Sequence, residues 1–284
     1  MYVLSLFDGM ACGRVALDRA GIVCDRYFAS EIDDHAIKVA QSNYPDIIQF
    51  GDVQALKASD LPKIDLLIGG SPCQGFSRIG KGLAFLDERS RLFFEYVRLL
   101  QDIQPKYFLL ENVIMKKEYQ DVISGYLGVE PVIIDSADFS AQKRKRLYWT
   151  NIPIASCEFP SNACLKDILE PNGNFKWITN LGVVTKTKNY LQYDVNGKGH
   201  RSASLRAYYP ESKHGALRGG APHAAKVSLP AGDVYLVRQL TQLECERLQT
   251  VPDFYTREAS EHQAKKMLGN GWTVDVIAHI LGSL

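Results

Sequence analysis

The amino-acid sequence predicts an α/β fold organised around a mainly parallel sheet. Three features of the first 150 residues support this prediction: short apolar runs recur, helix-length amphipathic segments separate them, and glycine, proline or acidic residues end most of the runs. Strands that alternate with helices form βαβ units, and right-handed crossovers place such strands parallel in one sheet.

The expected strands are runs rich in Val, Ile, Leu, Tyr and Phe. They cover residues 2–6, 26–30, 46–50, 64–69, 106–112, 131–136 and 146–150. Amphipathic spacing predicts intervening helices, and it returns near the carboxyl terminus. The expected helices cover residues 14–21, 33–44, 89–101, 241–250 and 273–281.

The alternation fades at about Asn151 into Pro-, Gly- and Asn-rich sequence with only short strand candidates. We therefore expect a large α/β domain over residues 1–150 and a smaller, mostly β or irregular domain over 151–237. The C-terminal helices over 238–284 are expected to pack back on the large domain.

Composition describes an ordinary globular chain of 284 residues, with 46% hydrophobic and 23% charged residues. No apolar run approaches the ~18 residues of a membrane helix. The start MYVLSLFDGM lacks the basic lead and cleavage site of a secretory signal. The six cysteines form no C-x-x-C pair, which argues against a disulfide framework and a zinc site. We expect no metal and a reducing, cytosolic setting.

A basic stretch between Thr185 and Lys226 stands out in a chain whose net charge is +1. This stretch contains eight Lys or Arg residues and two acidic residues, so its local charge is +6. Three histidines and four tyrosines lie among them. A solvated surface is the simplest interpretation of a charge run. Basic residues with aromatic and glycine neighbours are also typical of a nucleic-acid groove.

Acidic residues after successive strands predict a nucleoside-binding site. Glu31 and Asp52 each follow an expected strand, and Gly9 lies in the loop after the first strand. In doubly wound sheets such an acid accepts hydrogen bonds from ribose hydroxyls. The dinucleotide fingerprint G-x-G-x-x-G fails, because Ala11 and Arg14 occupy glycine positions. This disfavours a nicotinamide oxidoreductase and favours S-adenosyl-L-methionine, an adenosine cofactor without pyrophosphate.

Cys73 lies in the stretch GGSPCQGFSR, directly after the apolar run 64–69. The carboxyl end of a strand is where open α/β sheets bind ligands. A lone cysteine is more often a small buried hydrophobe. A turn rich in backbone N–H groups and near arginines would instead favour a nucleophilic thiolate.

The chain resembles the DNA cytosine-5 methyltransferase family over nearly its whole length. The matching stretches, in order, are LFDGMACG, SEID, GDV, GGSPCQGFS, ENV, QKRKRLYW, RQLTQLECERLQTVPDF and LGNGWTVDVIAHIL. Pro-Cys-Gln followed by Glu-Asn-Val and Gln-x-Arg-x-Arg is a highly specific combination. The MACG loop and the Trp of LGNGW are similar to the animal de novo branch of the family.

The resemblance implies a Rossmann-like methyltransferase sheet in a catalytic and cofactor-binding domain, and a target-recognition domain over 151–237. It implies methyl transfer to C5 of a flipped-out cytosine in double-stranded DNA, through a covalent bond between Cys73 and C6. The product of S-adenosyl-L-methionine would be S-adenosyl-L-homocysteine.

The resemblance also implies three groups of site residues. The catalytic group is Cys73, Glu111, Arg144 and Arg146. The cofactor-binding group is Phe7, Asp8, Gly9, Glu31, Ile32, Asp52, Val53, Pro72, Leu92, Asn270 and Trp272. The DNA-binding group is Gln74, Ser77, Arg78, Lys198, Arg201 and Arg206. Glu111 would hydrogen-bond the cytosine ring, and the two arginines would offer forks to the cytosine O2 and a phosphate.

Two alternatives stay open. One is a tRNA cytosine-5 methyltransferase of the same fold, although the Cys-Phe-Thr tripeptide of that branch is absent. The other is a catalytically inactive DNA-binding homologue, although the whole catalytic group is present. The expected setting is the cytoplasm of a bacterial or phage-infected cell, with nucleoid or phage DNA as substrate, no membrane, and a cognate restriction endonuclease as one partner.

Overall fold

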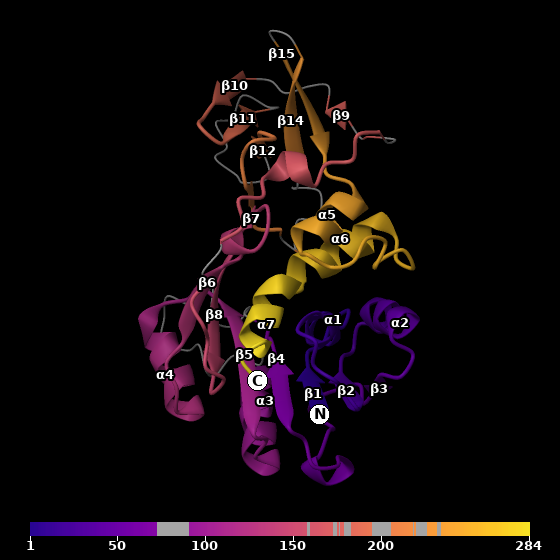
Figure 1. Cartoon of the computed structure of the whole chain (residues 1–284), viewed down its shortest axis with the longest axis vertical. Coiled ribbons are helices and arrows are strands. Elements are labelled where there is room, and N and C mark those ends of the chain that lie inside the picture. The colour runs from indigo at the N-terminus through magenta and orange to yellow at the C-terminus, as the bar shows by residue number, and fades with distance from the viewer. Residues whose placement is uncertain are drawn as a thin grey trace. The chain divides into compact units, whose positions relative to one another are not determined.

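The computed structural model describes residues 1–72, 91–157, 160–172, 175, 177–178, 183–194, 206–217, 219, 226–231 and 234–284. The chain forms two compact units (Figure 1). The first unit comprises Met1–Ile134, Lys145–Ser156 and Val276–Leu284. The second comprises Asp135–Arg144 and Cys157–Asp275.

A seven-stranded sheet in the order β3-β2-β1-β4-β5-β8-β6 forms the first unit. Its strands are β1 (Tyr2–Leu6), β2 (Arg26–Ser30), β3 (Ile48–Gln49), β4 (Leu66–Gly69), β5 (Tyr107–Val113), β6 (Val132–Asp135) and β8 (Lys145–Thr150). Its helices are α1 (Cys12–Arg19), α2 (Asp34–Asn43), α3 (Arg91–Ile103) and α4 (Lys117–Leu127). The predicted α/β class and the seven predicted strands are confirmed.

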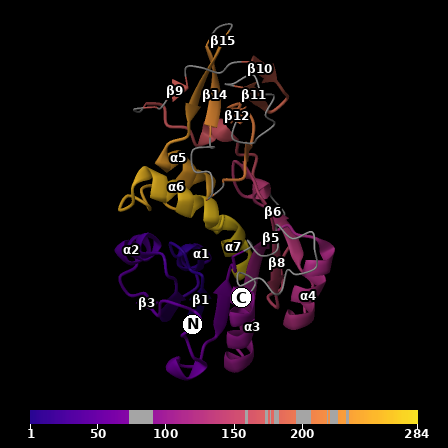
Figure 2. The ribbon, with the colours of Figure 1, turned by 180° about the vertical axis from the view of Figure 1, so that it is seen from behind.

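The five strands from β3 to β5 pair in parallel, whereas β5 and β8 are antiparallel. The chain runs from β1 outward to β3, then returns to β4 on the other side of β1. In open α/β sheets ligands bind at such a switch point, beyond the carboxyl ends of the strands. From the front and from behind, α1 and α2 lie beside β1–β3, and α4 lies beside β6 and β8 (Figures 1 and 2).

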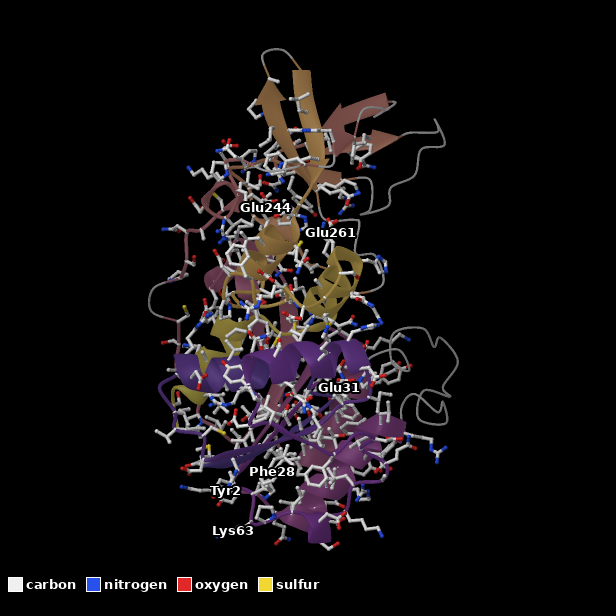
Figure 3. The ribbon with its side chains drawn as sticks, turned by 90° about the vertical axis from the view of Figure 1, so that its right-hand side faces the viewer. Tyr2, Phe28, Glu31, Lys63, Glu244 and Glu261 are labelled. Carbon is white, nitrogen blue, oxygen red and sulfur yellow. The ribbon has the colours of Figure 1, made fainter. Side chains whose placement is uncertain are left out.

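One apolar core cluster of the first unit lies against one face of this sheet. Leu4, Leu67 and Phe93 are completely buried in one cluster with Trp149. The Trp149 indole also donates from Nε1 to Ser124 Oγ at 3.0 Å, which satisfies its only polar group. The rings of Tyr2, at the start of β1, and Phe28, in the middle of β2, lie 6.3 Å apart (Figure 3).

Helix α4 is an element that the sequence reading did not anticipate. Its buried residues Tyr119, Ile123 and Leu127 recur at intervals of four, and Gly128 ends it in a left-handed conformation with φ of 71°. Both features are ordinary helix signals, so the helix could have been predicted.

The second unit contains a six-stranded sheet in the order β10-β11-β12-β14-β15-β9. Its strands are β9 (Trp177–Ile178), β10 (Val183–Lys186), β11 (Tyr190–Asp194), β12 (Arg206–Tyr208), β14 (Lys226–Ala231) and β15 (Val234–Gln239). A separate pair joins β7 (Gln142–Lys143) and β13 (His214–Gly215). Leu191, Tyr193, Ala207 and Val237 form the small apolar core on one face of the larger sheet.

The C-terminal helices are α5 (Gln242–Leu248), α6 (Glu261–Asn270) and α7 (Val274–Leu281). Thr241 caps α5 by accepting from Glu244 N, and Ser260 caps α6 in the same way through Gln263 N. Each forms a capping box, which satisfies backbone N–H groups at the helix start.

The division into units differs from the expected boundaries at 150 and 237. Residues 135–144, α5 and α6 group with the second unit, whereas 145–156 and 276–284 group with the first. Strand β8 belongs to the first unit because it pairs with β5 along five residues, from Leu109 opposite Thr150 to Val113 opposite Arg146. Each unit is therefore made of separate stretches of the chain, and the chain passes from one unit to the other more than once.

Candidate active site at the carboxyl edge of the seven-stranded sheet

The carboxyl edge of the seven-stranded sheet gathers most of the predicted site residues of the first unit. Strands β1–β5 are parallel, so their carboxyl ends lie at one edge, and the antiparallel β8 begins at that edge. The residues on or just beyond these ends are Phe7, Asp8, Gly9, Glu31, Ile32, Asp52, Val53, Pro72, Glu111 and Arg146.

The loop after β1 has an unusual backbone. Phe7, Gly9 and Ala11 have positive φ values of 57°, 60° and 63°. Residues other than glycine rarely adopt this conformation, and it persists where surrounding structure holds it, often at functional sites. Ala11 thus supports the turn although it stands in a glycine position of the dinucleotide fingerprint G-x-G-x-x-G.

Glu31 holds this loop against the end of β2. Its Oε2 accepts from Gly9 N at 2.8 Å, and its Oε1 accepts from Ile32 N at 2.8 Å and Asp33 N at 2.9 Å. A carboxylate offers about four acceptor positions, so Oε2 can still accept from a ligand hydroxyl. Figure 3 shows Glu31 at the end of the strands, away from Tyr2 and Phe28.

Asp8 is a buried carboxyl group in the same loop. Its Oδ1 accepts from the Tyr27 hydroxyl at 2.7 Å, and its Oδ2 has no hydrogen-bond partner among the described residues. Burial raises the pKa of Asp8 to about 7, and the nearby charge of Glu31 adds to the increase, against the hydrogen bond from Tyr27. A buried oxygen without a partner is costly, so this site suits a ligand that supplies a donor or a positive charge.

The ends of β2 and β3 present a polar and an apolar group. Asp52 is exposed, and its Oδ1 accepts from Gln54 N at 2.9 Å. Ser30 donates to Gly51 O at 2.7 Å, which fixes the turn before Asp52. Ile32 is 73% exposed, which is unusual for a large aliphatic side chain, and Val53 is buried.

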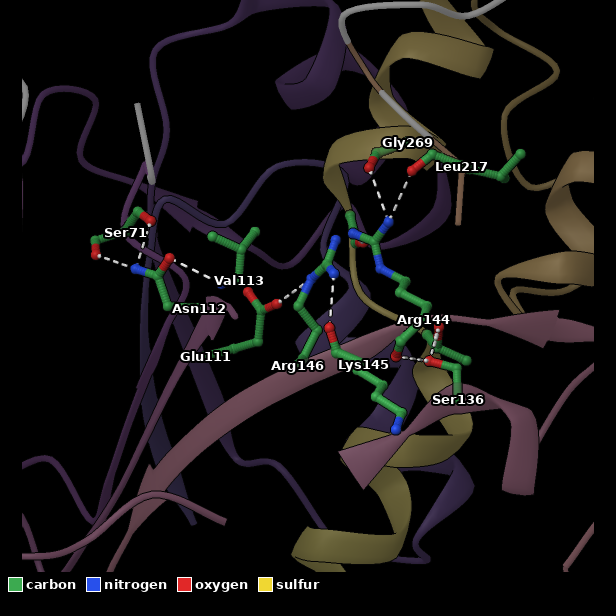
Figure 4. Close-up of polar contacts among 12 residues, drawn as sticks. Ser71, Glu111, Asn112, Val113, Ser136, Arg144, Lys145, Arg146, Leu217 and Gly269 are labelled. Carbon is green, nitrogen blue, oxygen red and sulfur yellow. Dashed lines mark hydrogen bonds and ion pairs between the residues drawn. The ribbon is translucent and has the colours of Figure 1, made fainter. Parts of the chain in front are cut away.

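Glu111 and Arg146 form an ion pair across β5 and β8. Arg146 Nε lies 3.0 Å from Glu111 Oε1, and Arg146 Nη1 donates to Lys145 O at 2.8 Å (Figure 4). The pairing register explains the contact, because Arg146 opposes Val113 and Glu111 opposes Tyr148, so both charged side chains share one face.

Asn112 fixes the segment that leads to Cys73. Its Nδ2 donates to Ser71 O and Ser71 Oγ, both at 3.2 Å, and its Oδ1 accepts from Val113 N at 2.8 Å (Figure 4). Both Asn112 and Ser71 are buried. Sequence reasoning did not assign Asn112 a role, although its place directly after Glu111 on a strand end was a usable signal.

The remaining predicted residues divide into three groups. Leu92, in α3, packs against the core of the first unit. Arg144, Arg206, Asn270 and Trp272 belong to the second unit. The predictions for Cys73, Gln74, Ser77, Arg78, Lys198 and Arg201 lie outside the described residues.

Arg144 is placed differently from Arg146, although the sequence reading treated them as a pair. Its guanidinium is buried and donates to main-chain carbonyl oxygens of the second unit, at Leu217, Gly269 and Gly271 (Figure 4). In this geometry both terminal nitrogens of Arg144 donate to main-chain oxygens, and its predicted contact with the nucleotide stays a prediction. Arg206, in contrast, is half-buried with its guanidinium 4.9 Å from the Tyr190 ring centre.

Two further properties concern only the part of the chain that the structure describes. No group of three or more His, Cys, Asp or Glu residues there could hold a metal ion. No helix there is long and apolar enough to cross a membrane.

Comparison with known proteins matches the whole chain to one family. The model of the C-5 cytosine-specific DNA methylases matches residues 1–284. The Type II methyltransferase M.HaeII of Haemophilus aegyptius is 31% identical over 303 aligned positions, which cover 99% of this chain and 92% of that protein. M.NgoBI of Neisseria gonorrhoeae, also a Type II methyltransferase, is 31% identical over 96% of this chain and 90% of its own length.

Solved structures share the fold at lower identity. The Entamoeba histolytica methyltransferase EhMeth superposes with a TM-score of 0.79 at 16% identity, covering 100% of this chain and 97% of that chain. The S. pombe Dnmt2 methyltransferase superposes with a TM-score of 0.73 at 18% identity, covering 99% and 97%. With the family match over the full length, these results identify the chain as a member of the C-5 cytosine-specific DNA methylase family, an enzyme that methylates cytosine in DNA.

Proposed function

We propose that the chain transfers a methyl group from S-adenosyl-L-methionine to C5 of a cytosine displaced from the DNA helix, with Cys73 as covalent nucleophile. The observation that carries this proposal is the Glu111–Arg146 ion pair. The neighbouring Asn112 binds Ser71, in the segment that leads to Cys73. The carboxyl group of Glu111 thus lies near the end of β5, and the segment that leads to Cys73 follows the neighbouring parallel strand β4.

The described residues of the carboxyl edge fit the cofactor. Glu31 keeps an acceptor oxygen for ribose hydroxyls, and Asp52 is an exposed acceptor for an adenine amine. The exposed Ile32 offers an apolar surface for an adenine ring. The unpartnered Oδ2 of Asp8 suits a cationic group. When bound, S-adenosyl-L-methionine supplies the electrophilic methyl group that cytosine C5 takes up.

The protein's part in the reaction begins with the Cys73 thiolate. Cytosine C5 is a poor nucleophile while the ring is aromatic. Addition of the thiolate forms an S–C6 bond and moves the C5–C6 π electrons toward C5, which makes C5 enamine-like. Once C5 carries the methyl group, a base removes the C5 proton, the S–C6 bond breaks, and the thiolate is regenerated.

Glu111 and Arg146 assist the addition step. A carboxyl group that hydrogen-bonds or protonates N3 withdraws electrons from the ring as sulfur adds. Arg146 fixes the Glu111 carboxyl through Nε, and its terminal amino groups can bind the cytosine O2. None of these groups can reach a stacked base, so the target must be flipped out of the duplex.

A duplex carrying 5-fluorocytosine tests the covalent mechanism. The C5 fluorine cannot leave as a proton does, so the S–C6 bond should persist after methyl transfer. We expect a stable protein–DNA adduct that requires S-adenosyl-L-methionine, with mass spectrometry locating the bond at Cys73.

Two controls make this experiment decisive. Cys73→Ser should form no adduct and should still bind DNA, since the nucleophile adds little ground-state affinity. Cys245→Ser should form the adduct normally, because Cys245 is buried in the second unit and burial raises the pKa of its thiol. An adduct in the Cys73→Ser protein, or none in the wild type, would refute the mechanism.

The similarity to two Type II methyltransferases over at least 90% of their length supports a role in restriction–modification, in bacterial or phage-infected cells. We infer that a cognate endonuclease recognises the same sequence and that methylation protects the site from it. Mapping methylated cytosines in DNA from cells that express the chain would define that site. Uniform methylation without a recurring sequence would contradict this role.

A further inference from the structure

A buried polar network in the second unit surrounds residues 268–273, which comprise the last residues of α6 and the loop before α7. Its members are Ser136, Gln142, Arg144, Gln249 and Thr273, and each is almost completely buried. All belong to the second unit, although they come from three separate parts of the chain. Buried networks of this kind are stable only when their members are mutually satisfied, so they fix a single geometry.

Arg144 lies at the centre of this network. Its Nη1 donates to Leu217 O at 2.9 Å and to Gly269 O at 3.2 Å, and its Nη2 donates to Gly271 O at 2.9 Å. Its own carbonyl oxygen accepts from Ser136 N at 3.1 Å. One planar guanidinium therefore holds two main-chain segments that are about fifty residues apart in sequence, 217 and 269–271.

Gln142 and Gln249 hold the same two segments from the other side. Gln142 Oε1 accepts from Leu217 N at 2.6 Å, and Gln142 Nε2 donates to Gln249 Oε1 at 3.0 Å. Gln249 Nε2 donates to Leu268 O, and Gln249 Oε1 accepts from Thr273 Oγ1 at 2.9 Å. Both the N–H and the C=O of Leu217 are thus tied to the network.

A direct contact joins the two segments as well. A Cβ atom added at Gly219 would overlap the side-chain amide of Asn270, so the Asn270 side chain lies directly over the Gly219 backbone. Only glycine permits this approach without displacing Asn270. The contact is independent of Arg144.

The two segments differ in expected function. Leu217 and Gly219 lie in the basic stretch 185–226, which we expect to contact DNA. Asn270 and Trp272 lie in LGNGW, which we expect to contact the cofactor. Because a rigid fork connects the two segments, neither can shift without straining the other.

We propose that Arg144 is a positioning residue that couples DNA binding to cofactor binding by holding Leu217 and Gly219 as one element with residues 269–272. This inference rests on the proposed function, since it assumes that the first segment contacts DNA and the second contacts the cofactor. Arg144 itself touches neither ligand. Linkage then requires that each ligand raise the affinity for the other by the same factor.

The coupling is measured by titrating S-adenosyl-L-homocysteine into the protein in calorimetry, with and without a saturating duplex that carries the mapped methylation site. We expect DNA to tighten wild-type binding by a factor in the usual range of about 5 to 150. Arg144→Lys keeps the charge but replaces the planar fork with a single ammonium. We expect the factor to fall below about twofold in this variant, toward the no-coupling limit.

A purely structural role for Arg144 makes a different prediction. It would lower the melting temperature and weaken both ligands alike, while the ratio of affinities with and without DNA stayed at the wild-type value. Lys143→Ala is the matched control, because the exposed Lys143 precedes Arg144 directly and should keep the coupling. Coupling in Arg144→Lys within twofold of wild type overturns the proposal.

Gly219→Ala is a second variant that tests whether the two segments act as one element, and it can be used if Arg144→Lys does not fold. The added methyl group must push Asn270 aside, so we expect S-adenosyl-L-homocysteine affinity to fall although residue 219 lies in the basic stretch. Gly125→Ala on α4 is the matched control, since a Cβ there meets open space. Unchanged affinity in Gly219→Ala contradicts the proposal. Wild-type protein that binds no S-adenosyl-L-homocysteine at all would instead refute the proposed function.

Discussion

The two sheets of the molecule present polar side chains in different ways. The strands β1, β2, β4 and β5 of the seven-stranded sheet are buried through almost their whole length, so the polar groups there gather just beyond or near the strand ends. The six-stranded sheet has one apolar face, and Tyr190, Gln192, Arg206 and Tyr208 lie half-buried on the other. Polar groups at strand ends are held in one geometry, which suits a reaction that needs exact placement. Side chains on a sheet face can be substituted without altering the backbone that carries them.

The anchoring of the polar groups differs accordingly. At the edge of the first sheet, Glu31 is held by three backbone N–H groups and Asn112 is held by Ser71. On the second sheet, the described partner of the Arg206 guanidinium is the Tyr190 ring. We therefore expect substitutions at the first edge to change the rate or the stability strongly, and substitutions on the second face to change affinity modestly.

The largest effect is expected for Glu111→Gln. The amide oxygen can still accept from Arg146 Nε, so the fold should persist, but the amide cannot supply a proton to the cytosine ring. We expect single-turnover methyl transfer to slow by about 10²- to 10⁴-fold, the usual contribution of a general acid. Glu118→Gln, at an exposed position of α4, should leave the rate unchanged. A rate of Glu111→Gln within tenfold of wild type would show that Glu111 does not act as a general acid.

The second largest effect is expected on the stability of the second unit, at a buried ion pair. Arg238 and Glu244 form a two-point ion pair at 2.7 Å, with side chains only 1% and 0% exposed. Arg238→Met leaves a buried carboxylate without its partner, and we expect urea denaturation to show a loss of about 3–5 kcal/mol. Adding Glu244→Gln should recover part of that loss, because the amide carries no charge to bury and its oxygen can still accept from Thr241 N or Glu170 N. Equal stability of the single and double variants would contradict this account.

Asp8 makes the stability of the first unit depend on pH. Its pKa of about 7 exceeds the ordinary value of 3.8, so between these values the folded state holds a proton that the unfolded state has lost. Its contribution to the free energy of unfolding is therefore fully present below pH 3.8 and is lost as the pH rises through 7, by at most about 4 kcal/mol at 1.36 kcal/mol per pKa unit.

Urea denaturation of Asp8→Asn across pH 4–8 checks this sign. The amide cannot ionise, so the variant should gain stability relative to wild type as the pH rises. The groups that face Asp8 are Ser5 and Tyr27, which favour its ionised form, and Glu31, which opposes it. A stability difference that stays constant from pH 4 to 8 would show that Asp8 ionises normally.

Much of the first unit could be predicted from the sequence, because parallel buried strands are continuous apolar runs with turn residues after them. Leu66–Gly69 and the acids after β2 and β3 are examples. The different fates of Arg144 and Arg146 could not be predicted. Alternate residues share a face, but the carbonyl partners of Arg144 lie 73 and more residues away, and no local pattern encodes such contacts.

The second unit was harder to predict for a related reason. Its strands are short, two to six residues, and the spatial order β10-β11-β12-β14-β15-β9 depends on pairing between distant segments. Basic and aromatic composition predicted a nucleic-acid surface there, but composition does not say which face of a sheet bears it. The register that places Tyr190 opposite Tyr208, and Gln192 opposite Arg206, supplies that information.

The smallest effect is expected for Tyr190→Leu on that half-buried face. The ring lies under the Arg206 guanidinium, whose Nε is buried without a hydrogen-bond partner among the described residues. Losing a cation–π contact of about 0.5–1 kcal/mol should weaken DNA binding roughly two- to fivefold without changing its salt dependence.

Arg206→Ala should weaken DNA binding more than Tyr190→Leu does. It should lower the salt slope by about 0.9 if the guanidinium contacts a phosphate, or cost about 1–3 kcal/mol at one base pair if it reads a guanine. Lys186→Ala, at an exposed position of β10, tests whether any lost charge has the same effect. Binding to the mapped site and to a scrambled duplex at several salt concentrations separates these outcomes, and unchanged affinity and slope in both Tyr190→Leu and Arg206→Ala would place DNA recognition away from this face.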